Sequence, residues 1–224
     1  MKFVKPLQIQ AYERLKAMII QGDFQPNVIY SETKVSQTLG VSRTPARDAI
    51  QRLAQEGYLD VLPSKGFCLH KMTERDLLET YQIRCALEGF CVVQLARDIE
   101  TSAARETVEK LETLLRKQQE VLEGSHSIAE FAKYDQEFHE TIVYYLQNAA
   151  ISETFDNFHY QMSRQIALSL GQEGRMEATL KEHRAIVENM RAGAAGRSYE
   201  AALEHLEKPK GIIHLDSDMQ EREG

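Results

Sequence analysis

The stretch from Gly40 to Leu53 reads Gly-Val-Ser-Arg-Thr-Pro-Ala-Arg-Asp-Ala-Ile-Gln-Arg-Leu and predicts the fold of the first third of this chain. Ser42 is a good helix N-cap, and the proline that follows it suits the first turn, where its missing N–H has no partner to lose. The apolar side chains then recur at helical spacing and define a buried face, formed by Ala46, Ala49, Ile50 and Leu53. Arg43 and Arg47 lie off this face, one turn apart, at the start of the helix.

A shorter helix pattern over residues 31–39 comes directly before this stretch, with Val35 and Leu39 facing inward and Gly40 ending it. Two short helices joined by a glycine turn, with exposed arginines at the start of the second, are typical of a helix-turn-helix. In that motif the first residues of the second helix contact DNA bases and phosphates. The side chains that we expect to contact DNA are Ser42, Arg43, Thr44 and Arg47.

Two strand-like runs follow, at residues 58–62 and 66–70, and they flank a Pro-Ser-Lys tip. A β-hairpin in this position is the wing of a winged helix, and we expect Lys65 and Gly66 at its tip to enter or border the minor groove. Without the preceding helices, Lys65 would be interpreted as an ordinary solvated lysine. The helix-turn-helix favours the DNA contact.

Charge and length divide the chain into two domains and a tail. Residues 1–72 hold ten Lys and Arg against six Asp and Glu, and the remainder holds seventeen against twenty-eight, so the net charge of −7 hides a basic N-terminal part. This asymmetry indicates that the basic part contacts nucleic acid. We expect a winged helix over residues 1–72, a helical domain over 73–215 and a frayed acidic tail over 216–224.

The sequence also indicates a cytoplasmic location. No stretch approaches the roughly eighteen apolar residues of a membrane span, and the N-terminus lacks the apolar core of a signal peptide, so we expect no membrane partner. The three cysteines have neither metal-binding nor redox spacing, which favours reduced thiols.

From Thr73 onward the apolar pattern is helical throughout. The predicted fold class is therefore mainly α, a winged helix-turn-helix followed by an all-α six-helix bundle. The six predicted helices cover residues 74–97, 101–122, 128–147, 150–170, 176–192 and 199–215. The first of them is expected to bury a broad apolar face that includes Leu78 and Phe90.

Four residues of this bundle carry side chains that could bind a metal ion. Asp135 and His139 are spaced i,i+4 and project from one helix face. His183 and His205 lie on later helices that a bundle can bring to the same place. One carboxylate and three imidazoles form a reasonable ligand set for Zn²⁺ or Ni²⁺. Because the spacing Asp-x-x-x-His also arises by chance, ordinary surface or core histidines are the alternative interpretation.

A series of motifs runs through the N-terminal part: Gly-Asp-Phe-x-Pro, Gly-Val-Ser-Arg-Thr-Pro-x-Arg, Gln-Arg-Leu, Glu-Gly-Tyr-Leu and Lys-Gly-Phe. Together they resemble the DNA-binding domain of GntR-family transcription regulators over residues 8–72. Two positions differ, since Asn27 follows Pro26 where the family usually has glycine, and Asp48 stands where it usually has glutamate. Asparagine tolerates left-handed backbone conformations, so the turn at Asn27 can be kept.

The helical part carries four further motifs: Arg84-x-x-Leu-Glu88, Tyr-Asp135-x-x-Phe-His139, Glu-His183-Arg-x-Ile and Ala-x-x-x-His205-Leu. They resemble the FCD ligand-binding domain of the FadR subfamily, in its six-helix VanR-like branch. The resemblance implies that the aspartate and three histidines bind a divalent metal and that a small carboxylate effector completes its coordination. It also implies that Arg84 clamps the effector carboxylate, whereas a simple i,i+4 ion pair with Glu88 is the other role open to this arginine.

We therefore expect an effector-responsive, DNA-binding transcription regulator, a repressor and not an enzyme. Two chains would form a homodimer on double-stranded DNA with a pseudo-palindromic operator. A small organic acid or sugar acid would bind at the metal and Arg84. Two alternatives stay open: a metal-dependent enzyme of small organic acids, in which the metal activates water, and a regulator whose signal is the metal itself. No general base or nucleophile motif supports the enzyme.

Overall fold

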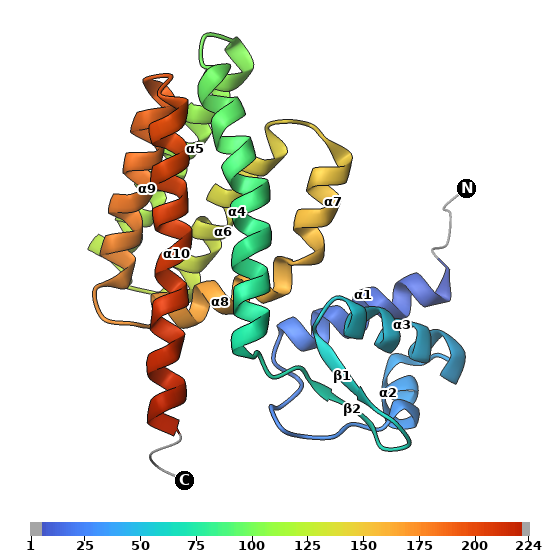
Figure 1. Cartoon of the computed structure of the whole chain (residues 1–224). Helices are drawn as coiled ribbons and strands as arrows, with labels where there is room; N and C mark the ends of the chain where they lie inside the picture. The colour runs from blue at the N-terminus through green and yellow to red at the C-terminus, as the bar shows by residue number, and fades with distance from the viewer. Residues whose placement is uncertain (1–5, 221–224) are drawn as a thin grey trace. The chain divides into compact units, whose positions relative to one another are not determined.

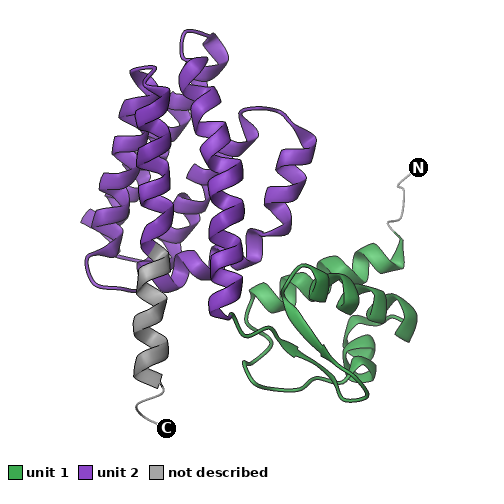
Figure 2. Cartoon of the chain, viewed as in Figure 1, with its two compact units in different colours: residues 1–72 green, residues 73–224 purple. Residues whose placement is uncertain are grey.

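The computed structural model describes residues 6–220, and the side chains up to residue 208. The chain divides into two compact units, residues 1–72 and residues 73–224, which are coloured separately in Figure 2. The following paragraphs describe each unit by itself.

The N-terminal unit is a helix-turn-helix with a β-hairpin wing, as predicted (Figure 1). Its elements are α1 (Leu7–Ile20), α2 (Glu32–Leu39), α3 (Arg43–Gln55), β1 (Leu59–Leu62) and β2 (Gly66–Leu69). Leu15 of α1 and both Ile50 and Leu53 of α3 are fully buried. This small core holds α3 in place while the polar face of α3 stays exposed.

The turn between α2 and α3 has the predicted backbone. Gly40 ends α2 in the left-handed conformation, with φ 68°, and Ser42 occupies the N-cap position of α3 with an extended backbone. The Ser42 side chain makes no capping hydrogen bond, so the residue begins the helix through its backbone conformation alone. Asn27 has φ 62°, which confirms that asparagine supports the turn after Pro26.

The wing is an antiparallel pair in which Leu59 lies opposite Leu69 and Leu62 lies opposite Gly66. Tyr30 joins its edge through a β-bridge to Phe67, with backbone N–H···O distances of 2.7 and 3.0 Å. Gly66 has φ 124°, and a Cβ atom there would collide with the carbonyl oxygen of Tyr30. Glycine is therefore required at this position by the close approach of the Tyr30 backbone.

The C-terminal unit is all-α, and its described residues form seven helices and not six. These are α4 (Glu74–Arg97), α5 (Ser102–Glu123), α6 (Ile128–Tyr144), α7 (Ala149–Asn157), α8 (His159–Leu170), α9 (Arg175–Arg191) and α10 (Ala195–Gln220). The segment predicted as one helix over 150–170 breaks at Phe158, whose ψ of 2° is not helical. The break lets Phe155 of α7 and Met162 of α8 both reach the core, although neither glycine nor proline marks it.

Helix α10 continues beyond residue 215 to Gln220, into the segment expected to be a frayed tail. The last part of that tail, residues 221–224, lies outside the described residues. None of the described helices is both long enough and apolar enough to cross a membrane.

Helix α4 buries only part of the broad apolar face that its sequence suggests, including Leu77 and Leu95. Leu78 and Phe90 are 40% and 49% exposed, whereas Thr80, Arg84 and Glu88 are buried. These three positions are spaced four residues apart, so α4 presents a polar stripe to the interior of the bundle. A buried polar stripe needs partners on the facing helices, and these partners lie in the candidate site.

Candidate functional site

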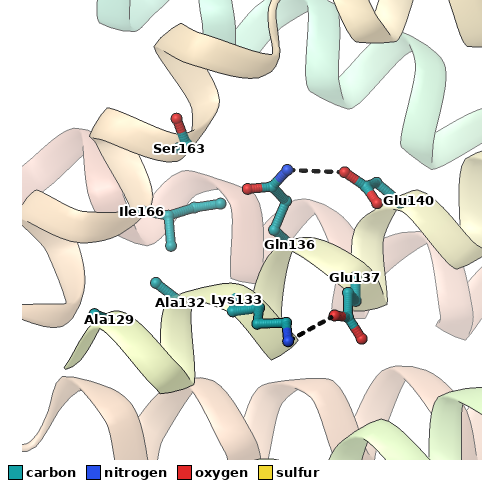
Figure 3. Close-up of a pocket in the computed structure, with 8 residues that line it drawn as sticks. All are labelled: Ala129, Ala132, Lys133, Gln136, Glu137, Glu140, Ser163 and Ile166. Carbon is teal, nitrogen blue, oxygen red and sulfur yellow. Dashed lines mark hydrogen bonds and ion pairs between the residues drawn. The ribbon is translucent and has the colours of Figure 1, made fainter. Parts of the chain in front are cut away.

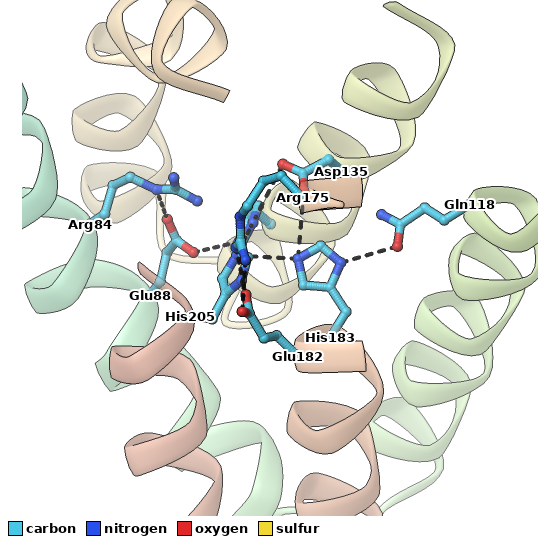
Figure 4. A network of polar contacts seen from close by, with 9 residues as sticks. Arg84, Glu88, Gln118, Asp135, Arg175, Glu182, His183 and His205 are labelled. Carbon is cyan, nitrogen blue, oxygen red and sulfur yellow. Dashed lines mark hydrogen bonds and ion pairs between the residues drawn. The ribbon is translucent and has the colours of Figure 1, made fainter. Parts of the chain in front are cut away.

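Three imidazoles and one carboxylate meet inside the C-terminal unit (Figure 4). Asp135 and His139 come from α6, His183 from α9 and His205 from α10, and their ligand atoms lie within 4.8 Å of one another. The Nε2 atom of His205 is 3.2 Å from that of His183 and 3.3 Å from that of His139. The carboxylate oxygens of Asp135 lie 3.7 and 3.6 Å from the Nε2 atoms of His139 and His183. All four residues are at most 5% exposed.

Each histidine of this cluster has an oxygen acceptor at its other ring nitrogen. The Nδ1 atom of His183 is 3.1 Å from Oε1 of Gln118, and that of His205 is 2.8 Å from Oε2 of Glu182. The Nδ1 atom of His139 is 2.6 Å from Oε2 of Glu88, an ion-pair contact without hydrogen-bond alignment. An acceptor at Nδ1 favours the tautomer with its proton there, so the lone pairs of all three Nε2 atoms face one another.

This arrangement fits a divalent metal ion. Nitrogen lone pairs that face one another, with Nε2–Nε2 separations of 3.2 and 3.3 Å from His205 to the other two rings, repel, and a cation at their centre turns that repulsion into attraction. Atoms that bind one ion at about 2.0–2.2 Å are themselves roughly 3.0–3.5 Å apart, and the four separations given above, 3.2–3.7 Å, are close to this range. Three imidazole nitrogens and one carboxylate oxygen are ligands that Zn²⁺ and its neighbours prefer. The cluster can therefore hold a metal ion.

The surroundings favour the neutral forms of His183 and His205. Burial, together with the neighbouring imidazoles, lowers the pKa of His183 well below its usual value. Burial also lowers the pKa of His205, although its hydrogen bond with Glu182 works in the opposite direction. The ring of His183 stacks on Phe138 with 4.0 Å between ring centroids, which fixes its orientation. Neutral, oriented imidazoles are the form that binds metal.

Two carboxylates next to the cluster, the buried Glu88 and the half-buried Glu182, are kept ionised by arginines. Burial by itself raises the pKa of Glu88, but the Arg84 guanidinium and His139 outweigh it and lower that pKa to about 2. Burial opposes ionisation of Glu182 as well, and hydrogen bonds from Arg175 and His205 lower its pKa to about 2. Each carboxylate thus links an arginine to a histidine of the cluster, as in the carboxylate–histidine pairs that surround many metal ions.

Sequence reasoning missed Gln118, Arg175 and the role of Glu182. Arg175, the first residue of α9, binds Glu182 in the middle of the same helix. The contact is bidentate, with N···O distances of 2.8 and 2.6 Å. Glutamine 118 is fully buried at a position of α5 where the helical spacing of Leu111, Leu114 and Leu115 calls for an apolar residue. A polar residue on an apolar stripe is a signal that could have identified Gln118.

Arg84 lies beside this cluster and is only 3% exposed. Its Nε atom donates to Oε1 of Glu88 at 2.6 Å, so the i,i+4 ion pair considered from sequence is present but is buried. Among the described residues, its Nη2 group has no hydrogen-bond partner. A buried guanidinium with an unused N–H group can still bind an anion.

The side chains expected to contact DNA lie together on the N-terminal unit. Ser42, Arg43, Thr44 and Arg47 are all exposed at the start of α3. Arg47 is paired with Glu32 at the start of α2, where Oε2 lies 3.1 Å from Nε and 3.1 Å from Nη2. Lys65 is exposed at the tip of the wing, and Gly66 begins β2 beside it. The residues predicted to contact DNA therefore include two exposed arginines and one exposed lysine, which a polyanion can reach.

A separate hollow of about 410 Å³ lies between α6 and α8 (Figure 3). Its polar groups are largely paired with one another, since Gln136 donates to Glu140 at 2.8 Å and Lys133 lies 3.9 Å from Glu137. None of its lining residues belongs to the four-residue cluster. The hollow does not provide an obvious charged ligand site.

Two protein families match this chain. Residues 7–69 match the family described as "Bacterial regulatory proteins, gntR family", and residues 79–208 match the FCD domain. An uncharacterised helix-turn-helix transcriptional regulator of Bacillus subtilis, YdhC, is 30% identical over 215 residues, which are 96% of this chain and 90% of YdhC. A gluconate operon transcriptional repressor of Bacillus licheniformis is 32% identical over 75% of this chain and 64% of its own length.

Solved structures share the fold. The structure of E. coli McbR/YncC has a TM-score of 0.72 and 20% identity, and covers 96% of this chain and 100% of its own. A metal-free FCD domain of TM0439, described as a transcriptional regulator, has a TM-score of 0.54 and 19% identity over 66% of this chain and 99% of its own. At these identities the likeness concerns the fold.

Proposed function

Because the chain belongs to the gntR family of bacterial regulatory proteins and carries an FCD domain, we propose that it is a repressor controlled by an organic acid bound beside a metal ion. The family consists of DNA-binding transcription regulators and not of enzymes, so the metal-dependent enzyme considered from sequence is set aside. DNA binding and an effector-binding FCD domain come with the family. The metal, the effector and the residues that bind them are the proposal.

The metal part of the proposal assigns a Zn²⁺ or Ni²⁺ ion to Asp135, His139, His183 and His205. The observation that carries this proposal is the convergence of three histidine Nε2 atoms. In each of these rings the Nδ1 atom already faces an oxygen acceptor. A bound divalent ion would supply a Lewis-acidic centre that attracts carboxylate oxygens. The carboxylates of Glu88 and Glu182 would hold the histidines in place.

The effector in this proposal is a small organic acid or sugar acid. Arg84 supports it, because this arginine is buried next to the cluster and keeps one N–H group without a partner among the described residues. A relative at 32% identity is named a gluconate operon repressor, which makes a sugar acid the first compound to test. A carboxylate shared by a metal ion and Arg84 would be bound through charge on two sides.

The part of the proposal that concerns DNA assigns contacts with bases and phosphates to Arg43 and Arg47. Ser42 and Thr44 would contact the DNA backbone. Lys65 and Gly66 of the wing would border the minor groove. Two such units in a homodimer would match the half-sites of a pseudo-palindromic operator. Effector binding would then favour one arrangement of the dimer and shift the population able to bind DNA.

The test combines metal analysis with calorimetry. The purified protein is expected to retain about one divalent ion per chain, and gluconate is the first of a panel of organic and sugar acids to be titrated. Binding of an acid by the metal-loaded protein should disappear after chelation and in Arg84→Ala. The proposal is overturned if no tested divalent ion binds. An acid that binds equally well after chelation contradicts the shared metal and arginine site.

Measurements of DNA affinity distinguish a regulator whose signal is the metal ion from one whose signal is the organic acid. A duplex enriched by the protein from a random pool serves as the probe, with and without chelator. If the metal is itself the signal, chelation alone switches DNA binding on or off. In the proposed repressor the acid changes DNA affinity, and chelation abolishes that change.

A further inference from the structure

Arg47, the second arginine of the recognition helix α3, is held by a carboxylate from the other helix of the motif. Oε2 of Glu32 accepts a hydrogen bond from Nε of Arg47 at 3.1 Å and also lies 3.1 Å from its Nη2 atom. Glu32 is the first residue of α2, so the pair joins the N-terminal ends of both helices. Within the part of the chain that the structure describes, Arg43 makes no such ion pair.

We propose that Glu32 is a specificity-determining residue, which orients Arg47 for base recognition and opposes its non-specific contacts with phosphate. The proposal rests on the DNA-contact role assigned to Arg47 above. It adds a function for a residue that is acidic and therefore does not itself attract DNA.

The geometry leaves Arg47 able to recognise a base while it is paired. Glu32 occupies the edge of the guanidinium formed by Nε and Nη2, and the remaining N–H groups on Nη1 and Nη2 are left for another acceptor. The Arg47 side chain is 64% exposed and that of Glu32 only 27%, so the arginine extends further into solvent than its partner. Two parallel N–H groups are what a guanine edge requires.

Electrostatics distinguishes the two kinds of contact. A phosphate that approaches Arg47 also approaches the negative charge of Glu32, whereas a guanine edge is neutral and is repelled much less. Glu32 also holds the Arg47 side chain in one orientation, so this side chain loses less conformational entropy when it binds a base. Because the Arg47–Glu32 pair is exposed to solvent, we expect the loss of Glu32 to change DNA affinity several-fold and not more.

The test compares Glu32→Gln with the unchanged protein on two duplexes of equal length, one enriched from a random pool and one of random sequence. We expect affinity for the random duplex to rise about three- to fivefold, and the salt dependence of that binding to steepen by about one phosphate contact. Affinity for the enriched duplex should change less, so the ratio of the two affinities falls. Asp48→Asn is the matched control, because it removes one exposed carboxylate from α3 that has no ion pair with Arg47 among the described residues.

A double-mutant cycle completes the test. In an Arg47→Ala background, Glu32→Gln should no longer change the ratio of affinities, because its partner is gone. The inference is overturned if Glu32→Gln shifts both duplexes equally, as expected for Asp48→Asn, or if its effect persists without Arg47. If Arg47→Ala weakens binding to the enriched duplex but the cycle shows no coupling, only the role of Glu32 fails. If Arg47→Ala leaves that binding unchanged, the DNA-contact role of Arg47 fails as well. Circular dichroism checks that each variant is folded.

Discussion

The Nε2 atom of His205 lies 3.2 Å from the Nε2 atom of His183, although the two residues are on different helices. Oxygen acceptors of Glu182 and Gln118 lie on the far side of the two rings, which favours the tautomers that carry their proton on Nδ1. In these tautomers the two Nε2 lone pairs face each other inside the protein. A cation bound by both nitrogens would remove the repulsion between the lone pairs, and the polar partners around each ring would orient the rings to bind it.

Removing one ligand should release the metal. His183→Ala is expected to reduce the bound metal from about one ion per chain to a small fraction, because the remaining three ligands hold a divalent ion far less tightly. Metal content after gel filtration, measured by mass spectrometry, is the readout. His126→Asn is the control, since His126 lies outside the cluster and its φ of 49° is one that asparagine accepts. Equal metal content in His183→Ala and in the unchanged protein would contradict the assignment.

Weakening the support of His205 should lower metal affinity without abolishing binding. Glu182→Gln keeps the shape of the side chain but removes the charge that orients His205, and we expect metal affinity to fall about 10- to 100-fold. Competition with a chromophoric chelator measures this change. Glu188→Gln removes a carboxylate from the exposed side of the same helix and should leave affinity unchanged. An unchanged metal affinity in Glu182→Gln would mean that the contact between Glu182 and His205 does not contribute to metal binding.

The metal-free protein should lose stability as the pH falls below the ordinary histidine pKa of 6.5. The pKa values of His183 and His205 are lowered in the folded state, so the unfolded chain takes up protons there that the folded chain does not. The free energy of unfolding therefore decreases as the pH is lowered from 6.5 towards the folded-state pKa values. Urea unfolding over this range is the measurement, with His183→Gln expected to show a shallower decrease. A parallel decrease in this variant would exclude His183 as a source.

Gly66→Ala should destabilise the N-terminal unit. The new Cβ atom would collide with the carbonyl oxygen of Tyr30, at a backbone φ of 124° that side chains rarely adopt. Gly40→Ala is the control, because φ there is 68° and nothing lies within 4 Å, so only backbone strain of about 1–2 kcal/mol is expected. Thermal unfolding of each variant gives the comparison. A smaller loss in Gly66→Ala than in Gly40→Ala would contradict the prediction, because it would show that the wing relieves the collision with the Tyr30 carbonyl.

Arg47→Ala should weaken binding to the enriched duplex by about 1–3 kcal/mol if this arginine contacts a base. If it contacts only phosphate, binding to all duplexes should weaken alike, and the salt dependence should become shallower by about one unit. Fluorescence anisotropy with both duplexes distinguishes the two results. Arg75→Ala is the control, because it removes an exposed arginine of α4 outside the N-terminal unit. Unchanged affinity for both duplexes would remove Arg47 from the DNA contact.

The sequence by itself was sufficient for the local structure of the N-terminal unit. A left-handed Gly40, Ser42 at the N-cap and an apolar face at helical spacing act within a few residues, so they can be recognised without knowledge of the fold. The four residues of the cluster could also be named, because the family motifs place an aspartate and three histidines on three helices. The helical fold class followed from the apolar period.

Only the tertiary structure decided which polar groups meet. The acceptors that orient the three imidazoles come from α4, α5 and α9, and the Glu32–Arg47 pair joins two helices. It also decided that Phe158 divides one predicted helix into two, and that α4 turns polar residues inward while Phe90 is exposed. The physical reason is that the spacing of apolar residues indicates only which face of a single helix or strand is buried. The partner of a buried polar group depends on how separate elements pack, which no single segment of the sequence contains.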